Sequence, residues 1–161
     1  MTVKLHFFKK PNVDMQPWPL DPSFATTINA ESFVWFNQSV NYMQPLSADA
    51  NAANFLGLCV DQSPLNLIGS TFTGGGNFNA NTNNMGLVAR YGQAAMFVTS
   101  GQSYVPGQAL YIGADAQTVT NIAGSNQIAY VSGEQAAITN AASGSKVLVD
   151  FRANWPNLAI R

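Results

Sequence analysis

The stretch Lys146-Val147-Leu148-Val149-Asp150-Phe151 alternates along its length in a way that decides the class of fold. Successive side chains of an extended strand point to opposite faces, so Val147, Val149 and Phe151 would share one face. Leu148 and Asp150 would lie on the other face. This pattern predicts a strand whose first face is buried in a core.

Similar short pieces fill most of the chain, and turn-forming Gly, Asn, Ser and Pro separate them. Only the segment Ala48–Asn54 leans towards helix, and its asparagines limit it to a turn or two. The sequence therefore predicts an all-β fold, a compact β-sandwich or small β-barrel of about 8–11 short strands. The other expected strands are Ser32–Phe36, Val40–Met43, Phe55–Asp61, Leu65–Phe72, Gly86–Tyr91, Gln93–Thr99, Ala109–Ile112, Gln117–Thr120, Gln127–Val131 and Gln135–Thr139.

Three regions are expected: an extended proline-rich N-terminal arm over residues 1–27, a β-rich domain over residues 28–152, and a C-terminal tail over residues 153–161. Four prolines between residues 11 and 22 exclude a helix in the arm and favour an extended path. Large apolar side chains in the arm and tail are expected to dock on a partner or a neighbouring subunit, or else to cover the core of their own chain. These candidate interface residues are Phe7, Phe8, Trp18, Leu20, Phe24 and Trp155.

Charge is scarce, and this favours a role in protein contacts. Between Gln62 and Ser145 the only formal charges are Arg90, Asp115 and Glu134, and charged residues make up 9% of the chain. A solvated surface normally carries about 25–35% charged residues. Covering a neutral surface with protein removes few ions from water, so the chain is interpreted as a component of an assembly.

Several classes of partner are disfavoured by composition. A net charge of −1 gives no electrostatic attraction to nucleic acid. No uncharged apolar run approaches the roughly 18–20 residues of a membrane span, and the N-terminus lacks a signal-peptide cleavage site. Cys59 lies in an apolar segment and is expected to be a buried, inert thiol. The protein is therefore expected to fold in a cytoplasm.

Catalytic groups are equally hard to find. His6 is the only histidine, so a histidine-based metal pair is excluded, and the carboxylates occur singly. Asp115 is expected to cap a turn, and Ser100 and Ser132 lie in turns without the surroundings of a nucleophilic serine. The three glycines at 74–76 lack the residues of a phosphate-binding loop. We therefore predict no catalytic residue, no cofactor, no metal and no enzymatic activity.

An internal similarity is visible between two parts of the chain. Glu31–Trp35 followed by Phe55–Cys59 has the same layout as Gln108–Ile112 followed by Gln127–Val131. Each pair joins an aromatic-bearing segment to one with small residues. Two related β units folded against each other would explain the similarity, and chance would explain it as well.

Five segments together carry a resemblance to a known family: Ile28–Trp35, Phe55–Asp61, Pro106–Tyr111, Gln127–Val131 and Lys146–Phe151. Over roughly residues 25 to 151, the chain resembles the small capsid decoration, or cement, proteins of tailed bacteriophages. Ala129 stands where glycine is common in that family. The proline-rich arm is where this sequence departs most from the family.

The resemblance implies a structural virion protein. Such a protein would form homotrimers, bind the outer face of the capsid and stabilise contacts between subunits of the major capsid protein. It would be assembled in the host cytoplasm, with no reaction involved.

Two alternatives remain. One is a head-fibre or tail accessory protein that binds host-surface carbohydrate through aromatic residues such as Trp35, Tyr91 and Tyr104. The other is a small hydrolase or nucleotide-handling trimer, which would need Arg90 or carboxylates gathered at a subunit boundary.

Overall fold

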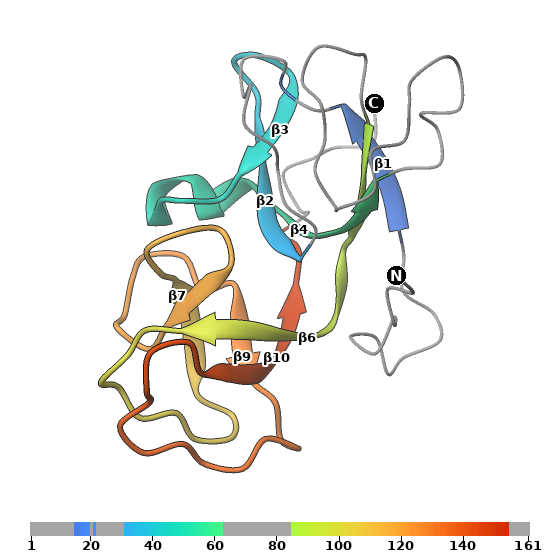
Figure 1. The fold of residues 1–161 in the computed structure, drawn as a ribbon. Helices are drawn as coiled ribbons and strands as arrows, with labels where there is room; N and C mark the ends of the chain where they lie inside the picture. Colours follow the sequence, from blue (N-terminus) through green and yellow to red (C-terminus); the bar gives the residue numbers. More distant parts are fainter. Residues whose placement is uncertain (1–14, 20, 22–30, 63–84, 155–161) are drawn as a thin grey trace.

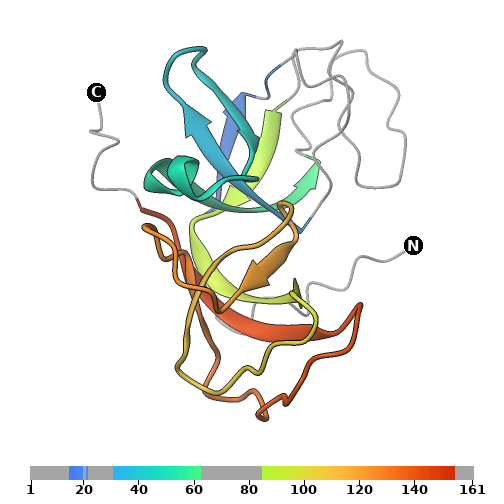
Figure 2. The ribbon, with the colours of Figure 1, turned by 90° about the vertical axis from the view of Figure 1, so that its left-hand side faces the viewer.

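The computed structural model describes residues 15–19, 21, 31–62 and 85–154, and these form two stacked β units (Figures 1 and 2). The elements of the first unit are β1 (Met15–Pro19), β2 (Ser32–Asn37), β3 (Tyr42–Pro45), the 3-10 helix η1 (Asp49–Asn54), β4 (Phe55–Gln62) and β5 (Met85–Ala89). Those of the second are β6 (Tyr91–Val98), β7 (Ala109–Ile112), β8 (Thr118–Thr120), β9 (Ala129–Val131) and β10 (Lys146–Arg152). The fold is all-β, as the sequence predicts.

The first unit is a five-stranded sheet of order β1-β5-β4-β2-β3, and the second is a closed barrel of order β6-β10-β9-β7-β8. The strands of the two units correspond one to one in chain order, so that β1 matches β6, β2 matches β7, and so on to β5 and β10. The corresponding neighbours are antiparallel in both units, and β6 and β8 close the barrel as a parallel pair. The two units therefore share one topology.

The register of the strands agrees as well. The pair Trp18↔Gly86 of β1 and β5 corresponds to Met96↔Val147 of β6 and β10. With one fixed difference in residue number for each pair of corresponding strands, the other strand pairs match too. They are Leu58↔Ala89 with Tyr130↔Asp150, Phe33↔Leu58 with Ala109↔Tyr130, and Phe36↔Met43 with Ile112↔Val119. The internal similarity noted above thus falls on equivalent strands, β2 with β7 and β4 with β9. Along β2, the structural match lies one residue from the sequence match.

Two main-chain bonds mark the closure of the barrel. The Phe97 N–H donates to the Gln117 carbonyl oxygen at 3.0 Å, and the Thr99 N–H donates to the Val119 carbonyl oxygen at 3.1 Å. Both donors lie on the side of β6 that faces β8. These bonds extend the parallel β6–β8 pairing to both sides.

In the first unit only one of these bonds has a counterpart. The Asp21 N–H donates to the Met43 carbonyl oxygen at 3.3 Å, at the position equivalent to Thr99 and Val119. Pro19 occupies the position of Phe97, and proline has no N–H to donate. Pro17, two residues earlier, lies on the same edge. The prolines therefore stand where β1 needs no donor for its ladder with β5, which is where an edge strand tolerates them.

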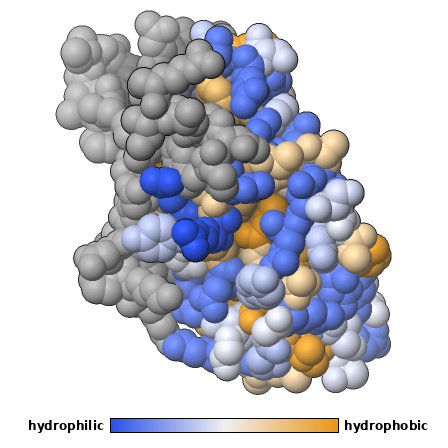
Figure 3. Space-filling model, turned by 180° about the vertical axis from the view of Figure 1, so that it is seen from behind, coloured by the Kyte–Doolittle hydropathy of each residue, from blue (hydrophilic) through white to orange (hydrophobic). Residues whose placement is uncertain are grey.

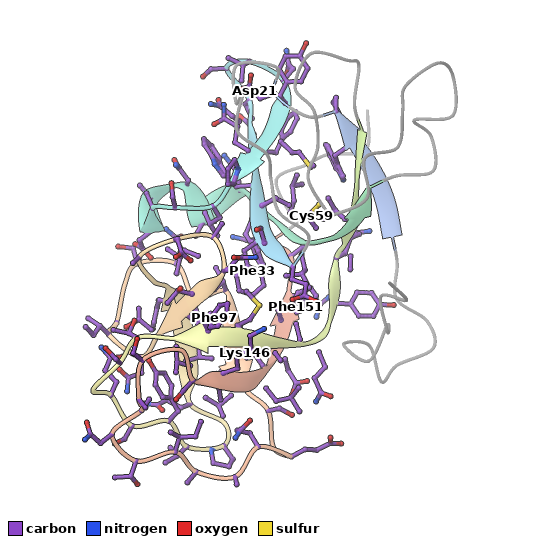
Figure 4. The ribbon with its side chains drawn as sticks, in the orientation of Figure 1. Asp21, Phe33, Cys59, Phe97, Lys146 and Phe151 are labelled. Carbon is purple, nitrogen blue, oxygen red and sulfur yellow. The ribbon has the colours of Figure 1, made fainter. Side chains whose placement is uncertain are left out.

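Two clusters of buried side chains form the core. The smaller cluster lies inside the first unit and contains Val34, Met43, Leu56, Cys59 and Val88, with Trp18 and Phe36 packed against it. The larger cluster fills the barrel and continues onto the other face of the first sheet. The rings of Phe33 and Phe151 meet at this junction with centroids 5.8 Å apart, and Phe33 also contacts Phe55 at 5.2 Å (Figure 4).

Most expected strands within the described residues are confirmed, and Val147, Val149 and Phe151 are buried together in the barrel. Cys59 is buried, as expected. The expected strand at 135–139 is wrong. A turn in which the Gln135 N–H donates to the Ser132 carbonyl begins the segment, and only Ile138 forms an isolated bridge, with Tyr104. The segment 65–72 and the glycine-rich loop after it lie outside the described residues.

Candidate interaction surfaces

One candidate surface is the outer wall of the barrel formed by β9, β10 and β6, here called the barrel face. It is defined by Tyr130 on β9, Lys146, Leu148 and Asp150 on β10, and Phe97 on β6. Tyr130 is 50% exposed and Phe97 is 36% exposed, while Leu148 between them is half-buried. The alternation that buries the barrel interior also places these side chains outside.

Charges on the barrel face are few but ordered. Lys146 lies opposite Phe97 on the neighbouring strand, and its ammonium nitrogen is 4.5 Å from the centre of that ring, a cation–π contact (Figure 4). Asp150 accepts a hydrogen bond from Gln93 Nε2 at 3.3 Å. A cation and an anion thus flank Leu148 on one strand.

A second candidate surface is the pair of loops that follow β6 and β8, here called the loop end and defined by Ser103–Val105 and Asn121–Ile122. Ile122 is 65% exposed and Val105 is 49% exposed. The Asn121 side-chain amide donates to the Ser103 carbonyl at 2.7 Å, which places the two loops side by side. On the face seen in Figure 3, hydrophobic residues are scattered among hydrophilic ones.

A polar network fixes the loop end. Gln102 Oε1 accepts from the Thr120 hydroxyl at 3.0 Å and from the Asn121 N–H at 3.3 Å. The Tyr104 hydroxyl lies 3.0 Å from the same oxygen and 3.1 Å from the Thr99 carbonyl oxygen. Burial raises the pKa of the Tyr104 phenol, and its bond with Thr99 partly offsets that effect. The exposed side chains of the loop end are therefore held by a rigid base.

Asp49 anchors the same β8–β9 loop further along. Its carboxylate accepts from the Ser125 N–H at 2.8 Å and from the Asn126 N–H at 3.1 Å. The Asn126 side chain donates in return to the Asp49 carbonyl at 2.9 Å. Sequence reasoning missed this role because Asp49 and Asn126 are far apart in the chain. Asp115 caps its own turn, as predicted, by accepting from the Gln117 N–H at 2.9 Å.

Of the six interface residues predicted from the sequence, only Trp18 lies within the described residues. Its ring packs on Phe36 of the same chain, with centroids 5.2 Å apart, and it is half-buried against the smaller core cluster. This matches the alternative in which an arm residue covers its own core. Phe7, Phe8, Leu20, Phe24 and Trp155 lie outside the described residues.

The aromatic residues considered for carbohydrate binding do not form a shared platform. Tyr104 is completely buried, so neither face of its ring can stack on a sugar. Trp35 packs against the larger core cluster, and Tyr91 is 37% exposed. Barrel-face and loop-end residues were missed as candidates because isolated strands and loops do not reveal which side chains remain uncovered.

Comparison of the chain with protein-family models and with curated proteins identifies no family. No protein-family model matches the chain, and no curated protein matches it. Within the described ranges, no group of three or more His, Cys, Asp or Glu side chains could hold a metal ion. No helix in the same ranges is long and apolar enough to cross a bilayer.

Proposed function

We propose that this protein is a structural component of a virus particle, a cement protein that binds the outer face of a tailed-phage capsid. The proposal joins the sequence resemblance to one observation, the rigid and apolar loop end. An exposed isoleucine and valine on loops fixed by hydrogen bonds lose little conformational entropy on binding. This favours docking on another protein surface.

The scarcity of charge supports the same role. Contacts made by neutral amide, hydroxyl and apolar groups depend little on ionic strength. Several copies held together would bind a repetitive shell more tightly than one, because the first contact raises the effective concentration of the others. The resemblance suggests three copies. In this proposal the loop end contacts the major capsid protein and stabilises its subunit contacts without chemistry.

The test is to mix the purified chain with shells assembled from the major capsid protein alone, and to measure bound copies by sedimentation. Bound wild-type protein should raise the temperature at which the shells melt. Replacing Ile122 with serine should weaken binding about tenfold per copy, because burial of a largely exposed isoleucine contributes about 1–2 kcal/mol.

Val40→Ser is the matched control. Val40 is 43% exposed in the turn between β2 and β3, away from the loop end. The Val40→Ser variant should bind shells as the wild type does. Absence of wild-type binding to any such shell, together with binding to glycans, would replace this proposal with the carbohydrate-binding alternative.

A further inference from the structure

Two positions of the barrel face have equivalents in the first unit, and those equivalents are covered. Leu58 and Ala89 of the first unit correspond to Tyr130 and Asp150 of the barrel face. Leu58 and Ala89 are completely buried in the larger core cluster, against the barrel. A wall of this topology is therefore already seen to pack on a β unit of the same topology within one chain.

In the second unit the equivalent positions are less covered, because Tyr130 is 50% exposed and Asp150 is half-buried. Tyr130 stands at the position of the buried Leu58, Leu148 lies diagonally from it on β10, and Phe97 lies further along on β6, opposite Lys146. Together they place aromatic and aliphatic area next to few charges, which is the composition of the centre of a protein interface. Aromatic anchors of this kind often contribute most to binding.

The charge pattern of β10 indicates what covers this wall. Lys146 and Asp150 lie two residues to either side of Leu148 and on the same face, about 13 Å apart at the usual rise per residue. A two-fold axis above Leu148, parallel to the sheet and perpendicular to β10, would place Leu148 opposite Leu148 of the other copy. It would also place each Lys146 opposite the Asp150 of the other chain. The face is thus complementary to itself, which is what an isologous contact requires.

We propose that the barrel face is a docking surface for a second copy of this chain, related by a two-fold axis at Leu148. The two walls would pack face to face at the separation usual for stacked sheets, about 10 Å. Such a contact gives a dimer in place of the three copies suggested by the resemblance. It uses neither residue of the loop end, so it stands or falls independently of capsid binding.

The test is the mass of the purified full chain in solution, measured by sedimentation across a range of concentrations. The wild type should form a species of twice the 17.2 kDa chain mass. Lys146→Asp should weaken the dimer about tenfold or more, because two attractive pairs become repulsive. Asp150→Lys should do the same.

The double variant Lys146→Asp with Asp150→Lys provides the decisive comparison. It exchanges the charges and should restore dimerisation to within a few-fold of wild type, which a merely destabilised barrel would not do. Ala142→Asp is the control, because Ala142 is exposed on a loop between β9 and β10. This variant should leave the dimer unchanged. A monomer or a trimer of wild-type protein, or a double variant as weak as the single ones, would overturn the proposal.

Discussion

Replacing Phe33 with alanine should destabilise both units together. Phe33 is completely buried where the first sheet meets the barrel. Truncation of a buried phenylalanine to alanine costs about 3–5 kcal/mol. The edge contacts with Phe55 and Phe151 place this site near the upper end, at about 4–5 kcal/mol, because each aromatic pair contributes about 0.5–1.5 kcal/mol beyond its buried area. A typical domain has only about 5–15 kcal/mol of stability to lose.

Urea unfolding at constant temperature, followed by two probes, checks this expectation. Tryptophan fluorescence follows Trp18 and Trp35 of the first unit together with Trp155, and the near-ultraviolet circular dichroism of tyrosine follows mainly the second unit, which holds four of the five tyrosines. The two transitions should coincide and move together to lower urea, with an unchanged slope. Phe97→Ala, at a half-exposed position, should cost about 1 kcal/mol. A loss below about 2 kcal/mol for Phe33→Ala, or a barrel transition that does not move, would show that the units fold separately.

Three further outcomes follow from single residues. The folded chain should lose stability as pH rises above about 10, because the phenol of Tyr104 ionises in the unfolded chain before it ionises in the folded chain. In urea titrations at pH 8–11, Tyr104→Phe should make this loss of stability smaller. In the same urea assay, Phe97→Pro should lower the free energy of unfolding by about 1–3 kcal/mol, because it removes an N–H donor that closes the barrel. Pro19→Ala at the equivalent position of the first unit should change the free energy of unfolding by less than about 1 kcal/mol. Asp49→Ala should cost about 1–3 kcal/mol in thermal unfolding, and Asp49→Asn should recover part of the loss, because an amide oxygen can replace only one of two acceptors.

Local pattern was enough to predict the fold class. The alternation in Lys146–Phe151 and the turn residues between segments are properties of neighbouring residues, and they place β10 and most other strands correctly. The failure at residues 135–139 has a local cause too. This segment has strand-like composition, but its backbone forms a turn at the beginning and meets a partner only at Ile138.

The role of the proline-rich segment could not be predicted in the same way. The prolines predict an extended path, but they do not predict that residues 15–19 pair with β5 of the same chain. In the fold, Pro17 and Pro19 stand on the edge of β1 that faces away from β5, so the ladder forms without their N–H groups. Which edge of a strand a residue faces depends on pairing with residues about seventy positions away. The two candidate surfaces depend on such long-range pairing in the same way.

The passage of the chain between the units has a mechanical consequence. β5 ends at Ala89 and β6 begins at Tyr91, so a single residue, Arg90, separates the two. The end of β10 returns to this point, where the Ala153 N–H donates to the Arg90 carbonyl at 2.6 Å and the Asn154 N–H donates to the Phe55 carbonyl at 2.9 Å. A hinge motion at Arg90 that separated the two units would have to break these bonds. The two units should therefore move together under an applied force and not bend at Arg90.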